Sequence, residues 1–205
     1  MPLASSGSVF EPEVELLHAL RCRLRPGRRP PSRPVLAAFV FVAGFLTIAL
    51  LAGLAVITGS PFVFPSLGPT AFLLYFSPTS VTATPRHALI GHAVGLVCGY
   101  GALWCTGLLH APAATVMGVT WARVIAAALS LASTGALLIL LRVVHAPAAA
   151  TTLIVSLGII TRPWQLAAIE LAVVVMVGCA IVLNRFAGIP YPFWESPDRR
   201  PPPPL

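Results

Sequence analysis

The 205-residue sequence contains no lysine, and charged residues of every kind make up only 9% of it. Soluble domains of this size usually carry about 25% charged residues. This scarcity of charge, with 57% hydrophobic residues and a mean hydropathy of +0.89, excludes an ordinary soluble domain. The sequence therefore indicates an integral membrane protein, whose backbone polar groups at depth need partners within the protein.

Motifs for catalysis and metal binding are also missing. The sequence has no GxSxG, HExxH, phosphate-binding loop or dinucleotide fingerprint, and its four cysteines form no CxxC pair. Three of them fall within apolar runs, where cysteine behaves as a small apolar residue. We therefore expect no enzyme activity, no cofactor, no metal site and no disulfide framework.

All the positive charge is arginine, and the net charge is +7. One cluster precedes the first apolar run: Arg21, Arg23, Arg25, Arg28, Arg29 and Arg33. Such a cluster can bind nucleic acid. A basic flank that fixes orientation and meets anionic lipid explains it better, so we expect the lipid bilayer as partner and no nucleic acid.

The two ends of the chain are predicted to lie outside the membrane. Residues 1–34 are too long and too acidic for a signal peptide, so we expect a basic cytoplasmic arm. Within it, residues 11–25 are interpreted either as a short helix on the membrane surface or as a disordered segment. Residues 187–205 are predicted to be a flexible, proline-rich tail.

Residues 35–186 are predicted to form an all-α transmembrane domain. Four long apolar runs exceed the ~20 residues needed to cross a bilayer: Val35–Thr58, His87–His110, Val116–Leu141 and Gln165–Phe186. Two shorter runs with prolines near their starts lie between them: Pro61–Phe76 and Val143–Ile160.

The arginines between the runs indicate how many times the chain crosses. Suppose that the N-terminus is cytoplasmic. If the short runs return to the side from which they start, Arg86, Arg142 and Arg162 all lie on the outer side of the membrane. If the short runs cross, Arg86 and Arg142 lie inside with both termini. The positive-inside rule therefore favours six crossings over four.

The prolines repeat at a fixed distance. A shift of 78 residues places Pro69 on Pro147 and Pro85 on Pro163. Six crossings would then form two three-span halves of opposite orientation, about residues 35–110 and 113–186. In transporters built as inverted repeats, interrupted segments at corresponding positions surround the central site.

Each short run is predicted to hold a half-helix that begins at a proline, since proline at the first helical position sacrifices no hydrogen bond. Helices starting at Pro69 and Pro147 would begin near mid-membrane with free N–H groups. Gly68 and the alanines after Pro147 would let backbones approach closely, and Thr70 and Thr151 would add hydroxyls. Such a pocket suits a small anion, although a purely structural broken helix remains an alternative.

Three residues with charged or imidazole side chains lie well inside long runs, away from their ends. Arg123 and Glu170 lie at similar predicted depth, which suggests that they pair, and His92 is the repeat counterpart of Glu170 and would face the same cavity. Intramembrane ionisable residues are candidates for function. A structural ion pair is the alternative.

Glycines recur every four residues in one long run, at Gly91, Gly95 and Gly99. Small residues at this spacing permit close contact between helices. Packing within the chain is the first interpretation, and the seam of a homo-oligomer is the second.

Two stretches, PSLGPTAFLLYFSPTSVTATPRHALIGHAVG and HAPAAATTLIVSLG, resemble the HPP integral membrane family over about residues 35–186. The family is named for a His-Pro-Pro motif, which here reads His145-Ala146-Pro147. Its members are usually described with four spans and include plastid nitrite transporters. The resemblance implies a transporter or channel for a small anion, with nitrite as a candidate.

His145 precedes the second half-helix, where it would donate to an anion, titrate with proton coupling, or cap the turn as a neutral group. A non-transporting membrane partner or an intramembrane enzyme is the alternative function. We expect a bacterial inner-membrane location with both termini cytoplasmic.

Overall fold

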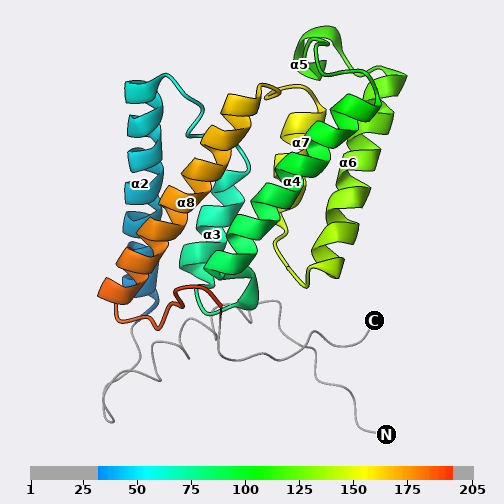
Figure 1. Cartoon of the computed structure of the whole chain (residues 1–205). Coiled ribbons are helices and arrows are strands. Elements are labelled where there is room, and N and C mark those ends of the chain that lie inside the picture. The colour runs from blue at the N-terminus through cyan, green and yellow to red at the C-terminus, as the bar shows by residue number, and fades with distance from the viewer. Residues whose placement is uncertain (1–31, 196–205) are drawn as a thin grey trace, which may run out of the picture.

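The structure is a computed structural model that describes residues 32–195, and this part of the chain contains helices but no strands. Four apolar helices are long enough to cross a membrane: α2 (Arg33–Thr58), α4 (Pro85–Cys105), α6 (Trp121–Leu140) and α8 (Pro163–Phe186). Two ten-residue apolar helices lie among them: α3 (Leu67–Phe76) and α7 (Pro147–Ser156) (Figure 1). The predicted fold class of four long and two short segments is confirmed.

Prolines set most helix starts, as the sequence predicts. α4, α7 and α8 begin at Pro85, Pro147 and Pro163, where the missing N–H has no partner in a helix anyway. α2 ends at Thr58, and the next residue, Gly59, has a φ of 62°, the left-handed conformation that commonly terminates helices.

Three predicted boundaries differ from the structure. α3 begins at Leu67, two residues before Pro69, because the chain already turns into the helix at Ser66. The third long run is interrupted at Gly118 (φ 79°), which separates the single turn α5 (Ala114–Met117) from α6. α4 ends five residues before the predicted end of its run, in turns at residues 106–111.

Hydrogen bonds define the two ends of the bundle. At one end, the Arg86 guanidinium donates to the carbonyls of Leu141 (3.1 Å) and Arg142 (3.5 Å). At the other end, the Ala114 N–H donates to the Leu157 carbonyl at 2.9 Å. We call these the Arg86 end and the Ala114 end.

Each short helix, with the coil before it, leads from one end of the bundle to the other (Figure 1). Residues 59–76 start at the Ala114 end, after α2, and finish at the Arg86 end before the 3-10 turn η1 (Val81–Ala83) and α4. Residues 141–156 run the opposite way, from the end of α6 to Leu157. Neither segment returns to the end from which it starts, as six passes through the bundle require.

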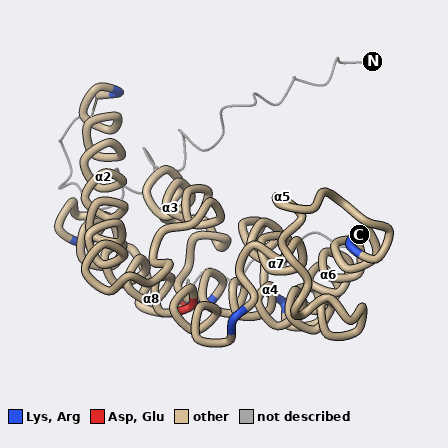
Figure 2. The backbone as a smooth tube through the Cα atoms, turned by 90° about the horizontal axis from the view of Figure 1, so that it is seen from above, with Lys and Arg blue, Asp and Glu red and all other residues tan. Residues whose placement is uncertain are grey.

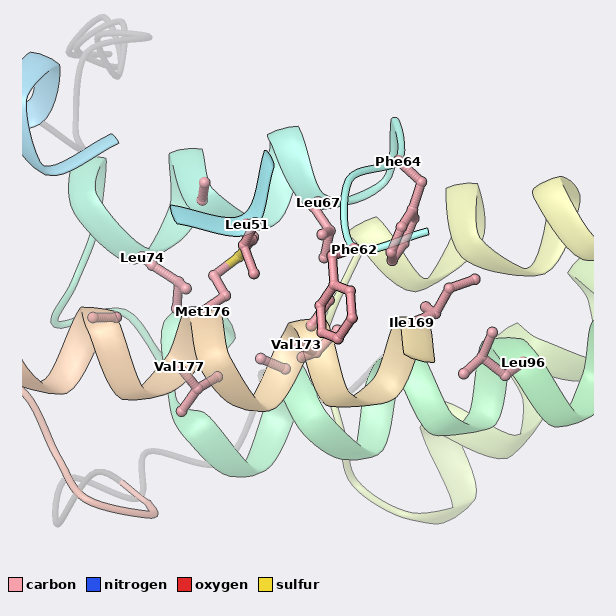
Figure 3. Close-up of a cluster of buried hydrophobic side chains, with 14 of the residues drawn as sticks. Leu51, Phe62, Phe64, Leu67, Leu74, Leu96, Ile169, Val173, Met176 and Val177 are labelled. Atoms are coloured by element: carbon pink, nitrogen blue, oxygen red, sulfur yellow. The ribbon is translucent and has the colours of Figure 1, made fainter. Parts of the chain in front are cut away.

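Apolar side chains join α2, α3 and α8 in one cluster (Figure 3). Leu51, Leu74, Met176 and Val173 are completely buried in it, and a Thr47–Tyr75 hydrogen bond ties α2 to α3. The outward faces are also apolar, and large side chains such as Trp121 and Phe186 are more than four-fifths exposed. That pattern suits a surface that meets lipid rather than water.

The segment after α8 packs against the Arg86 end, so the prediction of a flexible tail from residue 187 is wrong as far as residue 195. The Tyr191 hydroxyl donates to the Ala83 carbonyl at 2.6 Å, and burial raises the pKa of this phenol, which keeps it protonated. The Arg86 N–H donates to the Trp194 carbonyl at 3.0 Å. Residues 1–31, with the surface helix predicted at 11–25, and residues 196–205 lie outside the described part.

Candidate functional site

The first turns of the two short helices lie side by side and run in opposite directions. Thr151, one turn into α7, donates to the hydroxyl of Ser66, the residue before α3, at 2.9 Å. Thr70, one turn into α3, lies 3.4 Å from Nε2 of His145, two residues before α7. The N-terminal ends of both half-helices therefore overlap in the middle of the bundle.

His92 on α4 connects these two helices. Its Nε2 lies 2.8 Å from the Thr70 hydroxyl and its Nδ1 lies 2.6 Å from the Thr151 hydroxyl. We call Ser66, Thr70, His92, His145 and Thr151 the hydroxyl–imidazole cluster. No member is more than 1% exposed. The two imidazole centroids are 5.0 Å apart.

His145 is held by backbone rather than by α7. Its Nδ1 donates to the Thr82 carbonyl at 3.1 Å, because a carbonyl can only accept. α7 has no side-chain cap, and Ala146 occupies the capping position, so the interpretation of His145 as a cap is wrong. The ring is instead fixed with Nε2 directed toward the cluster.

Most of the predicted binding residues come together, with two exceptions. Thr70, His145 and Thr151 are cluster members, and Pro147 is buried at the start of α7. Gly68 and Pro69 are exposed, and a Cβ on Gly68 would meet nothing within 4 Å. The predicted role of Gly68 in close backbone approach is therefore wrong.

Ser66 belongs to the site but was missed from the sequence. A serine just before a helix usually indicates a cap, yet α3 has no side-chain cap and the Ser66 hydroxyl accepts from Thr151 instead. The signal that could have found Ser66 is its place immediately before a half-helix in an apolar run.

The close approach predicted for Gly68 occurs at the α4 glycines. A Cβ on Gly91 would lie 2.7 Å from Cβ of His145, and one on Gly95 would lie 2.8 Å from the carbonyl oxygen of Ala148. A Cβ on Gly99 would lie 2.7 Å from Cβ of Val155. α7 therefore occupies this face of α4, which rules out a homo-oligomer seam through the three glycines.

Arg123 on α6 supports the far end of α7. It is 3% exposed, and its guanidinium donates to the carbonyls of Ser156 (3.1 Å) and Pro112 (2.8 Å). Ser156 is the last residue of α7, so the positive charge meets the negative end of that helix dipole.

Glu170 lies elsewhere, in a groove of about 720 Å³ between α4 and α8 whose other lining is almost entirely apolar. Its Oε2 is buried and has no hydrogen-bond partner in the structure. Within residues 32–195, the partners of Arg123 are the two carbonyls, so the predicted Arg123–Glu170 pair is wrong. His92 points into the cluster, so it does not share a cavity with Glu170.

Because Arg123 and Glu170 lie in separate environments, substitutions of the two residues should change the stability of the protein independently. Arg123→Leu should lower the stability by about 3 kcal/mol, because two buried carbonyls lose a charged donor. Glu170→Gln should change it by less than about 1 kcal/mol, since its buried oxygen has no partner to lose. Thermal unfolding in detergent of both single variants and the double variant measures this. Additive changes are expected, and a double variant more stable than the sum of the single changes by over about 1 kcal/mol would restore the ion pair.

Comparison with known proteins identifies one family. The family model described as "HPP, transmembrane region" matches residues 29–192. No curated protein and no solved structure matches the chain. The matched region contains every helix described above.

Proposed function

Because this integral membrane protein belongs to the HPP transmembrane family, we propose that it is a transporter or channel for a small monovalent anion. Nitrite is the leading candidate, on the resemblance to plastid nitrite transporters. The observation that carries the proposal is the hydroxyl–imidazole cluster between the first turns of α3 and α7.

The cluster offers an anion several kinds of favourable contact. Two helix N-termini contribute partial positive charge, and each such contact contributes on the order of 1 kcal/mol. Hydroxyl and imidazole groups add hydrogen-bond donors that replace part of the hydration shell of the ion. Binding shared among modest contacts suits transport, since one very tight site would trap the ion.

The charges in the described part of the chain also favour an anion. Charged positions are sparse along the helices (Figure 2). Within residues 32–195 the acidic side chains are Glu170, in its groove, and Glu195, which pairs with Arg86 at 3.4 Å. Neither is a member of the cluster, so no carboxylate there repels an anion or attracts a cation.

We also propose six membrane crossings in two inverted halves, in a bacterial inner membrane with both termini cytoplasmic. Supporting this, α4 and α8 begin at Pro85 and Pro163, which are 78 residues apart, and the short helices run in opposite directions. Arg86 and Arg142 lie together at the end where the described part of the chain begins and finishes, as the positive-inside rule favours.

Transport is tested with purified protein in liposomes. We expect uptake of nitrite above that of empty liposomes, measured beside nitrate, formate and chloride. Gly68→Leu should leave the rate within about twofold of wild type, because its side chain would enter open space. Well-folded protein that moves none of the four ions would contradict the proposal and favour a non-transporting partner subunit.

Orientation is tested with single cysteines in a cysteine-free background. Val81→Cys lies near the Arg86 end and Thr115→Cys lies at the Ala114 end, and both positions are exposed. An impermeant thiol reagent on intact cells should label Thr115→Cys and spare Val81→Cys until the cells are opened. Labelling of Val81→Cys from outside, with Thr115→Cys protected, would reject six crossings in favour of four.

A further inference from the structure

We infer that the His92–His145 pair takes up one proton together with the anion, so that one anion and one proton move in the same direction without net charge. The inference rests on the proposed function and states how that function is driven. It follows from a count of hydrogens in the cluster and from the charges around it.

Thr70 has one hydroxyl hydrogen and three neighbours. Its oxygen lies 3.1 Å from the Ser66 carbonyl, 2.8 Å from Nε2 of His92 and 3.4 Å from Nε2 of His145. The Ser66 carbonyl can only accept, whereas His92 can donate from Nε2. Whether the Thr70 hydroxyl faces more acceptors than it has hydrogens therefore depends on the protonation of His145.

Neutral His145 already uses its single N–H. That hydrogen is on Nδ1, which donates to the Thr82 carbonyl, so Nε2 presents a lone pair to Thr70. Two acceptors, the Ser66 carbonyl and His145 Nε2, then compete for one hydroxyl hydrogen. A proton added to Nε2 removes the competition, because His145 donates to Thr70 and Thr70 donates to Ser66.

The other side of the cluster has no such conflict. Thr151 donates to Ser66 at 2.9 Å when the single N–H of His92 is on Nδ1, from which Thr151 accepts at 2.6 Å. When His92 instead donates from Nε2 to Thr70, the direction reverses: Ser66 donates to Thr151, and Thr151 donates to Nδ1. His92 can therefore exchange which nitrogen carries its hydrogen. One added proton satisfies the cluster, and a second would place two positive rings 5.0 Å apart.

A charged imidazole at this depth needs a compensating charge, since burying an unpaired ion is costly. The titratable and charged groups around it supply no negative one. α4 contributes His87 and Arg86, the coil before α7 contributes Arg142, and α6 contributes Arg123 at the far end of α7. Glu170 on α8 lines a separate groove, and Glu195 pairs with Arg86.

The missing negative charge is the transported anion itself. The proton adds to the lone pair of His145 Nε2, and no other covalent bond forms or breaks. The anion then accepts from His145 Nε2 or from the Thr70 hydroxyl, in place of the acceptor that this group has within the cluster. Release of both on the opposite side restores the neutral pair. Each cycle therefore moves one anion and one proton, and the binding of each favours the binding of the other.

A third buried imidazole, His87, lies on the side of the cluster that faces the Arg86 end. It is 3% exposed, its Nε2 lies 3.3 Å from the Arg86 guanidinium, and its Nδ1 accepts from the Val144 N–H at 3.5 Å. Val144 is the neighbour of His145 in the chain. A buried imidazole therefore lies between Arg86, whose side chain is 23% exposed, and the coil that carries His145.

The test determines whether a pH gradient or a membrane potential drives nitrite uptake into proteoliposomes. The rate of empty liposomes is subtracted, because nitrous acid crosses bilayers unaided. Lowering the external pH from about 8 to about 6 should raise the wild-type initial rate more than tenfold, because the coupled proton is then about a hundredfold more concentrated outside and favours binding of the anion. A potential imposed with valinomycin and potassium should leave it unchanged. His145→Gln should lose the response to pH and follow the potential, whereas His110→Gln, at an exposed position, should behave as wild type.

The outcomes separate the two claims. A wild-type rate that follows the potential and is the same at both pH values overturns proton coupling and leaves anion transport standing. No rate above empty liposomes for any of the anions overturns both. Because wild type alone decides between these results, a poorly folded His145→Gln variant would not obscure the answer.

Discussion

Replacing Gly95 with alanine should destabilise the bundle by about 2 kcal/mol, although alanine is the better helix former by up to ~1 kcal/mol. The added Cβ would lie 2.8 Å from the carbonyl oxygen of Ala148 and 3.4 Å from the backbone nitrogen of Thr152. Both are backbone atoms of α7, so the clash can be relieved only by moving that helix. Thermal unfolding in detergent measures the loss.

Gly101 is the matched control for Gly95. It lies on the same helix, and a Cβ there would meet nothing within 4 Å. Gly101→Ala should therefore keep or raise stability, by up to about 1 kcal/mol. If both substitutions stabilise the protein equally, α7 does not pack on α4 as described.

Displacing α7 should also stop transport. The helix supplies Thr151 and follows His145, so an outward movement would separate both from His92, which is fixed on α4. We expect anion uptake by Gly95→Ala to fall more than tenfold at a temperature where the variant is still folded. Uptake at the wild-type rate by a folded Gly95→Ala protein would place the site away from α7.

Thr151→Val is expected to reduce anion uptake about 10- to 100-fold with a modest loss of stability, about 1–2 kcal/mol. Valine keeps the shape of the side chain but removes the hydroxyl. Three contacts disappear with it: to Nδ1 of His92 at 2.6 Å, to Ser66 at 2.9 Å and to the Pro147 carbonyl at 3.5 Å. Initial rates in proteoliposomes at equal protein content measure the change.

Thr152→Val tests whether position in the cluster, rather than burial, matters. Thr152 is as buried as Thr151 and lies beside it on α7, but its hydroxyl donates to the Ser130 carbonyl at 3.4 Å instead of to the cluster. We expect its uptake to stay within about threefold of wild type. Equal losses in the two variants would assign the effect to packing of α7 and remove the cluster from the transport pathway.

The Gly95 and Thr151 predictions concern two features of the contact between α4 and α7. Gly95 concerns how closely two backbones approach, and Thr151 concerns the polar groups that this approach brings together. Glycine at the contact lets α7 lie against α4, and the contact places His92 within hydrogen-bond distance of a residue 59 positions further along the chain. The site therefore depends on packing between helices more than on any local motif.

The sequence by itself determined the class of the protein and the order of its elements. Scarce charge and long apolar runs require a membrane-spanning bundle, and prolines fix where helices begin because they lack the N–H that a helix interior needs. The starts of α4, α7 and α8 follow directly from Pro85, Pro147 and Pro163. Candidate residues Thr70, His92, His145 and Thr151 were also found from their places in or beside apolar segments.

Only the tertiary structure decided which of these residues meet. Similar depth suggested an Arg123–Glu170 pair, but depth leaves the direction around a helix axis open, and their side chains face the end of α7 and the groove of α8 respectively. The direction around the helix axis also explains why the close approach predicted at Gly68 occurs elsewhere. Gly68 faces open space, whereas Gly95 faces the backbone of α7. Proline and hydropathy act within a few residues of chain and can be read in sequence, whereas the rotation and approach of helices arise from packing between distant segments.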